Sequence, residues 1–131
     1  MIDTTNKPLQ QVSNEIAAAL TNQGKRCVNS DDECVYQDSE GNHCAIGFLL
    51  EPNSDPIFNV TDLCDILLDF DEDEIGVNSG FIRENYNALS HIQSIHDTTH
   101  NQRAIECTEI LEGLYEINMS AWSEWIEDMP N

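Results

Sequence analysis

Carboxylates are the side chains in this sequence with the most evident capacity for chemistry, and they are dense in residues 61–74, TDLCDILLDFDEDE. Thr61 suits a helix N-cap, after which four apolar residues recur at i, i+3, i+4 and i+7 as one stripe. The stripe consists of Leu63, Ile66, Leu67 and Phe70, and Asp62, Asp65 and Asp69 share the opposite face. Carboxylates at this spacing lie about 5–6 Å apart, close to the roughly 6–7 Å between successive phosphates of a DNA strand. The segment therefore predicts a helix whose outer face imitates nucleic-acid charge.

The predicted partner-binding surface has two parts, both made of Asp and Glu. The first continues from that helix into the acidic run that follows it. The second lies on a C-terminal helix, where glutamates recur at i, i+3, i+6 and i+10. The two sets are Asp62, Asp65, Asp69, Asp71, Glu72, Asp73 and Glu74, and Glu106, Glu109, Glu112 and Glu116. Two such rows on rigid helices would imitate the two strands of a duplex.

Residues 69–80, DFDEDEIGVNSG, invite comparison with a calcium-binding loop. Glu74 stands where an EF-hand requires glycine, and Gly80 stands where it requires a bidentate glutamate. Because both the hinge glycine and the strongest ligand are replaced, the sequence predicts no EF-hand. The acidic run is expected to bind divalent cations only weakly, and no cofactor is expected.

Residues 96–100, HDTTH, differ by one substitution from the zinc-protease sequence His-Glu-x-x-His. The two threonines suit a cap between two helices, so His96 and His100 are not expected to share one helix face. Instead, His96 and Asp97 are predicted to cap a helix or to hydrogen-bond at a helix end. The enzymatic alternative is a metal-dependent hydrolase that uses His96, His100 and a glutamate such as Glu116.

The sequence contains five cysteines and no Cys-x-x-Cys pair, so they are predicted to be reduced thiols. They are Cys27, Cys34, Cys44, Cys64 and Cys107. All of them except Cys34 are predicted to be small buried side chains. His43 and Cys44 are neighbours on a predicted strand, so their side chains would point to opposite faces and could not act as base and nucleophile. A zinc site built from Cys34, His43, Cys44 and a later histidine is an alternative with no standard ligand spacing.

Charge is the most unusual property of the whole chain. It has 131 residues, 25 of them acidic and 5 basic, for a formal net charge of −20. Such a field repels nucleic acid and anionic membranes, and it attracts basic protein surfaces. The N-terminus lacks the regions of a signal peptide and no window could span a membrane, so a cytoplasmic location is expected. Adaptation to a saline cytoplasm would also account for the acidic excess.

These groups must be positioned by a helix-dominated α+β fold, predicted as a single domain over residues 1–131. Helices are predicted at 8–23, 61–70, 79–96, about 99–115 and from Ser120 to Pro130, with loops at 52–60 and 71–80. A small β-hairpin is predicted from residues 34–36 and 43–46, with DSEGN as its turn. Gly47 is predicted either to end the second arm or to let a backbone pass closely. Trp122 and Trp125 are predicted either to pack on the core or to anchor a partner.

Two motifs carry a resemblance to known proteins. They are the segment CVYQDSEGNHCAIGFLL, which contains Gly-x-x-Cys-Ala-Ile-Gly, and a later run formed by Leu89, Ile92, His96 and Asp97. Together they resemble small, mostly uncharacterised phage and bacterial proteins, which implies a phage or mobile-element context without a defined activity. In charge alone, the chain is similar to phage DNA-mimic inhibitors.

Charge and resemblance together predict a phage-type acidic inhibitor that acts by stoichiometric binding and not by catalysis. Its expected partner is a basic, nucleic-acid-binding protein of the host, such as restriction, CRISPR or related defence machinery, or a polymerase. The chain itself is expected to bind neither nucleic acid nor membrane.

Overall fold

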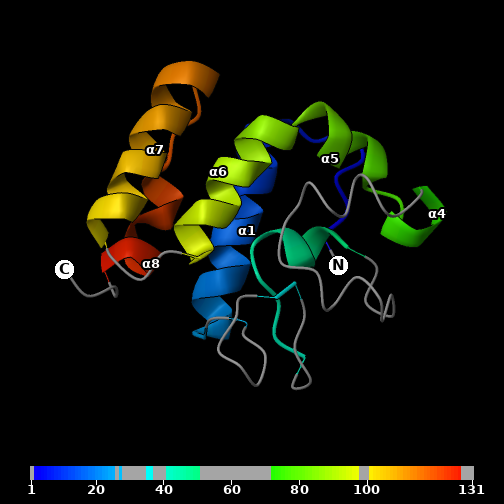
Figure 1. Cartoon of the computed structure of the whole chain (residues 1–131), viewed down its shortest axis with the longest axis horizontal. Coiled ribbons are helices and arrows are strands. Elements are labelled where there is room, and N and C mark those ends of the chain that lie inside the picture. The colour runs from blue at the N-terminus through cyan, green and yellow to red at the C-terminus, as the bar shows by residue number, and fades with distance from the viewer. Residues whose placement is uncertain are drawn as a thin grey trace.

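A computed structural model of the chain describes residues 2–25, 27, 35–36, 41–50, 72–97 and 101–127. The helix predicted at 61–70 and the loop predicted at 52–60 lie outside these residues. Within them the fold is dominated by helices, which confirms the larger part of the predicted fold class (Figure 1).

Helix α1 (Leu9–Gln23) matches the predicted first helix. Pro8 precedes it with an extended backbone, and Gly24 ends it in the left-handed region at φ 72°. The Gly24 N–H donates to the Leu20 carbonyl at 2.9 Å, which satisfies a carbonyl that the helix end leaves free. The buried face of α1 carries Val12, Ser13, Ile16, Ala17 and Leu20.

Glutamine side chains fasten both ends of α1 to distant segments. The Gln10 amide donates to the Asn118 carbonyl at 2.8 Å and accepts from the Asn118 N–H at 2.6 Å. In the same way, the Gln23 amide donates to the His43 carbonyl at 2.8 Å and accepts from the His43 N–H at 2.9 Å. Each side-chain amide thus pairs with a backbone peptide group as a neighbouring strand would.

The predicted hairpin is wrong at its second arm. Ala45 has helical dihedral angles and Ile46–Leu49 form the 3-10 helix η1, and the described residues contain no β-strand. A backbone hydrogen bond of 3.2 Å from Cys44 to the Tyr36 carbonyl still joins the two segments. The helical turn places Ile46 and Leu49 on the same side of the segment, where both are buried. A strand would instead point successive side chains to opposite faces.

The region after residue 71 is more helical than predicted. Helix α4 (Glu72–Ile75) lies where a loop was expected, and its last residue is fully buried. The single helix predicted at 79–96 is instead two helices, α5 (Ser79–Glu84) and α6 (Tyr86–Asp97). Asn85 separates them, since its backbone leaves helical values at φ −113°, ψ 24° and its side-chain amide donates to the Phe81 carbonyl at 3.0 Å.

Asn78 connects three parts of the fold. Its side-chain oxygen accepts from the Thr4 N–H at 3.0 Å and from the Thr4 hydroxyl at 2.7 Å. Its amide nitrogen donates to the carbonyls of Ile2 at 2.6 Å and Leu49 at 2.9 Å. The fully buried Asn78 amide therefore makes four hydrogen bonds, which connect the N-terminal segment to η1 and to the start of α5.

Helices α6 and α7 (Asn101–Tyr115) lie side by side in opposite directions, with α1 behind α6 (Figure 1). The predicted end of α7 near Tyr115 is confirmed. The chain then returns through η2 (Ser120–Trp122) and α8 (Ser123–Glu127), which pack against α1 and α7. Trp122 is fully buried, and its indole N–H donates to the Ser13 hydroxyl at 3.0 Å. None of the helices that the structure describes has the length and apolar character needed to cross a membrane.

Candidate partner-binding surface

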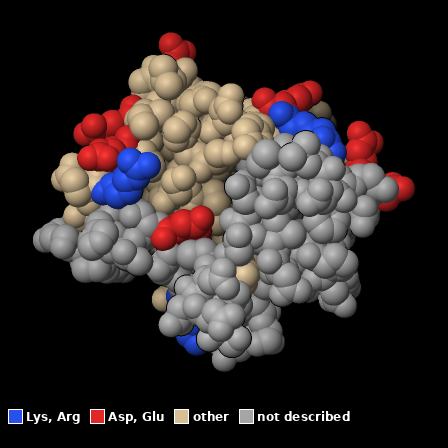
Figure 2. Space-filling model, in the orientation of Figure 1, with Lys and Arg blue, Asp and Glu red and all other residues tan. Residues whose placement is uncertain are grey.

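The exposed side of α7 carries the best-defined part of the predicted acidic surface. Glu106, Glu109 and Glu112 are all exposed, whereas Ala104, Cys107, Thr108 and Leu111 form the buried side of the helix. Because a helix turns about 100° per residue, each step of three places the next carboxylate about 60° back around the axis. The three carboxylates therefore form a slanted row on the outer half of α7, and Figure 2 shows acidic atoms along that edge of the molecule.

The row is not purely acidic. Arg103 Nη1 lies 3.5 Å from Glu106 Oε2 one turn further along α7, and both side chains are largely exposed. This exposed pair lowers the local negative charge without contributing much to stability. Glu109 and Glu112 form no ion pair with any residue that the structure describes, so they are the most available carboxylates of the row.

Glu116 departs from the predicted row. Helix α7 ends at Tyr115, and Glu116 follows it in the left-handed region at φ 54°. Its carboxylate is exposed but is not held at a helical spacing from Glu112. The predicted row therefore does not extend to Glu116, because the chain leaves the helix there and turns toward the buried Ile117.

The other predicted row is only partly within the described residues. Glu72 and Asp73 are exposed on α4, and Glu74 belongs to the same helix. Asp62, Asp65, Asp69 and Asp71 lie outside the described residues. Figure 1 places α4 and α7 at opposite ends of the long axis of the molecule, with α5 and α6 between them. The structure therefore does not bring the described members of the two rows together.

The surface over α6 is nearly uncharged. Helix α6 contains no Lys or Arg and one carboxylate, Asp97. Figure 2 shows mostly uncharged side chains over this part of the face in view. On α5, by contrast, Arg83 and Glu84 are both exposed.

The two motifs behind the resemblance meet in the core through Gln93. Its side-chain oxygen accepts from the Ile46 N–H at 3.0 Å, and its nitrogen donates to Asp97 Oδ1 at 2.9 Å. The same Asp97 oxygen lies 2.9 Å from Nδ1 of His96, which is fully buried and stacks on Trp125 with ring centroids 5.8 Å apart. The predicted hydrogen bond between His96 and Asp97 at a helix end is confirmed.

This arrangement gives no support to the zinc-protease comparison. His100 lies outside the described residues, and His91 is a boundary residue that contacts the Tyr115 ring. No group of three His, Cys, Asp or Glu side chains able to hold a metal occurs among the residues that the structure describes. The alternative zinc site cannot be assembled there either, because Cys34 is outside those residues.

The described cysteines are buried, as predicted. Cys27 and Cys44 have no exposed surface, and Cys107 is 2% exposed. Burial raises the pKa of the Cys44 thiol well above its ordinary value, and to a smaller extent it raises the pKa of Cys107. Both thiols are therefore neutral and poorly suited to nucleophilic attack. Cys64 lies outside the described residues.

Both tryptophans pack on the core, which is the first of their two predicted roles. Trp122 belongs to the core, and its indole is shielded from any partner. Trp125 is half-buried against His96, and its indole N–H is buried without a hydrogen-bond partner among the described residues. The partner-anchor prediction is therefore wrong for Trp122.

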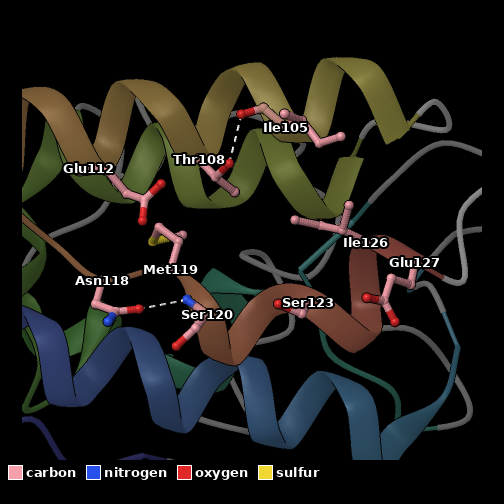
Figure 3. A pocket seen from close by; sticks show the side chains of 9 residues that line it. All are labelled: Ile105, Thr108, Glu112, Asn118, Met119, Ser120, Ser123, Ile126 and Glu127. Carbon is pink, nitrogen blue, oxygen red and sulfur yellow. Dashed lines mark hydrogen bonds between the residues drawn. The ribbon is translucent and has the colours of Figure 1, made fainter.

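A groove beside the acidic row was not foreseen from the sequence. It has a volume of about 380 Å³ and lies between α7 and the segment formed by η2 and α8. Figure 3 shows its nine lining residues, which are Ile105, Thr108, Glu112, Asn118, Met119, Ser120, Ser123, Ile126 and Glu127. Glu112 belongs both to this groove and to the acidic row, so the two features form one continuous surface. The one feature of the sequence that could have indicated the groove is Ile105, an apolar residue beside the polar face of α7.

No protein-family model, no curated protein and no solved structure matches this chain at a significant level. The resemblance to small phage and bacterial proteins therefore stays a prediction that rests on the two motifs joined by Gln93.

Proposed function

We propose that this protein is a phage-type acidic inhibitor that binds a basic, nucleic-acid-binding protein of the host. The partner belongs to restriction, CRISPR or related defence machinery, or is a polymerase, and the acidic surface occupies the site of its nucleic acid. The observation that carries the proposal is the row of exposed carboxylates on α7, within a chain of net charge −20. Successive members of the row are separated by about the spacing of phosphates on a strand.

Helix α7 supports this role because its geometry is fixed before the partner arrives. Its buried side packs along α6, so the carboxylates are presented by a rigid element. Because the helix backbone is already ordered, binding costs only the freedom of the glutamate side chains, and a concentrated negative field accelerates encounter with a basic groove. Neither the enzymatic alternative nor the halophile alternative is favoured by a particular observation in the described residues.

The test begins with the full chain immobilised and exposed to a bacterial lysate, from which basic proteins are eluted with salt. Each retained protein is then mixed with labelled duplex DNA, and free inhibitor is added. We expect the DNA to be released as the inhibitor concentration rises. Retained proteins that keep their DNA at saturating inhibitor would contradict the proposal. The inhibitor alone should not retard duplex DNA at physiological salt, because counterion release requires Lys and Arg.

A matched pair of double variants tests the location of the surface. Glu109→Gln with Glu112→Gln should weaken displacement by roughly 1 kcal/mol per carboxylate where the pairs are desolvated. Glu84→Gln with Glu124→Gln removes the same charge from exposed sites outside the row and should displace DNA almost as well as the parent. Equal losses in both variants would show that only total charge matters.

The predicted row at 61–74 needs its own variant. Asp62→Asn, Asp65→Asn and Asp69→Asn together should leave folding intact and weaken displacement if that row also contacts the partner. Normal folding with full displacement would restrict the contact to α7.

A further inference from the structure

The groove between α7 and α8 has an apolar centre. Ile105 and Ile126 face each other across it, and Met119 forms part of its floor (Figure 3). Ile105 is 37% exposed although isoleucine favours burial. This surface gains free energy whenever a partner's apolar group covers it.

Some polar groups along the groove already have internal partners. The Thr108 hydroxyl donates to the Ile105 carbonyl at 2.7 Å, and the Ser120 N–H donates to Asn118 Oδ1 at 2.8 Å. The Ser120 and Ser123 hydroxyls can both donate and accept, so they do not restrict the ligand, whereas the charged groups of the lining are the carboxylates of Glu112 and Glu127. A ligand that contacts these two groups must bring hydrogen-bond donors or positive charge, because an ionised carboxylate only accepts.

Those carboxylates lie at the two ends of the groove. Figure 3 shows Glu112 at one end and Glu127 at the other, with the apolar centre between them. Both are exposed, neither forms an ion pair with a described residue, and no Lys or Arg lines the groove. The charge pattern is thus negative, apolar, negative, and its complement is positive, apolar, positive.

We propose that the groove binds one large apolar side chain of the basic partner protein, flanked in the partner's sequence by Lys or Arg residues that contact Glu112 and Glu127. The inference rests on the proposed function, since it describes how the same partner is gripped beside the acidic row. A volume of about 380 Å³ lies at the lower end of the range for ligand pockets, so the groove has room for one large side chain but not for a helix. The acidic row then supplies attraction, and the groove selects among basic partners.

Two amidated peptides test this directly on the full chain. Lys-Lys-Phe-Lys-Lys and Lys-Lys-Ser-Lys-Lys carry equal charge and differ only in the central side chain. We expect the Phe peptide to bind about tenfold more tightly, because burial of an aromatic ring exceeds the roughly 1.4 kcal/mol that a tenfold change requires. Its binding should shift the amide resonances of Ile105, Met119 and Ile126. Equal affinity for both peptides would overturn the inference and leave the proposed function standing.

A variant that fills the groove provides the second measurement. Ser123 is exposed and lines the groove, so Ser123→Phe should abolish the preference for the Phe peptide while the Ser peptide binds as before. Ala18→Phe adds the same ring at an exposed position of α1 outside the groove and should keep the preference. A preference that persists in Ser123→Phe would overturn the inference. So would self-association of the parent that Ser123→Phe removes, since the groove would then bind a second copy of the chain.

Discussion

At the scale of single residues, Gly47 and Gly113 differ in the space that surrounds their Cα atoms. A Cβ atom on Gly47 would overlap the backbone carbonyl of Tyr36, whereas a Cβ atom on Gly113 would meet nothing within 4 Å. The close approach at Gly47 agrees with the sequence expectation that a backbone passes there. The glycine is therefore required for η1 to lie against Tyr36.

Substitution of each glycine by alanine should change stability in opposite directions. Gly47→Ala should lower the free energy of unfolding by about 1–3 kcal/mol, because neither backbone can move aside freely. Gly113→Ala lies within α7 and should raise it by about 1 kcal/mol through helix propensity. Urea denaturation of both variants measures the changes. A stable Gly47→Ala variant would contradict the described contact.

The buried thiol of Cys44 predicts a dependence on alkaline pH. Desolvation raises its pKa well above the ordinary value of 9.0, so the unfolded chain loses this proton first as pH rises. The stability contributed by the neutral thiol is complete below pH 9.0 and is lost progressively above it. Thermal melts of the parent and Cys44→Ala between pH 7 and 10 should therefore diverge above about pH 9. Parallel curves would contradict the burial of this thiol.

At the scale of elements, the predicted and observed structures agree where periodicity and caps act together. The apolar spacing in α1, with Pro8 before it and Gly24 after it, identified that helix almost to the residue. The apolar spacing in residues 79–96 predicts that Ile82, Tyr86, Leu89 and Ile92 face inward. Three of them are fully buried, and Tyr86 is partly buried. The spacing did not reveal the interruption at Asn85, because it continues across the break and the cause is a local hydrogen bond.

Other elements depended on contacts that no local pattern contains. The acidic run at Glu72 and Asp73 suggests a loop, but the fully buried Ile75 holds α4 in place. The groove was missed because Ile105 and Ile126 come from separate helices. Of the candidate site, the sequence anticipated the exposed carboxylates on α7 and overextended the row to Glu116, which lies beyond the end of the helix.

Substitution of Arg103 tests whether the exposed side of α7 faces the partner, without removing a carboxylate. Arg103→Gln releases Glu106 from an exposed ion pair, so stability should change by less than about 1 kcal/mol. Binding to a partner retained from lysate should tighten, because the row gains negative potential. Isothermal titration at fixed salt measures the affinity. Unchanged binding by Arg103→Gln would mean that α7 does not face the partner, and weaker binding would mean that Arg103 itself contacts the partner.

At the scale of the whole molecule, 25 acidic residues face only 5 basic ones, and their mutual repulsion opposes the compact state. The melting temperature should rise measurably between low salt and about 0.5 M sodium chloride, where the Debye length is only a few Å. The rise should be smaller in the Glu109→Gln, Glu112→Gln variant, whose repulsion is already reduced. A melting temperature independent of salt would contradict a concentrated negative field.

The pair of hydrogen bonds between Gln10 and Asn118 also has a consequence for biosynthesis. Gln10 and its partner Asn118 are 108 positions apart in the sequence, and Ser13 and its partner Trp122 are 109 positions apart. At about 5–20 residues per second, a ribosome takes roughly 5–20 s to supply those partners after α1 is made. During that interval the apolar face of α1 lacks the core residues that later segments supply. This face carries Val12, Ile16 and Leu20. The nascent chain is therefore exposed to chaperones and proteases until the segment that contains Asn118 and Trp122 has been translated and can cover α1.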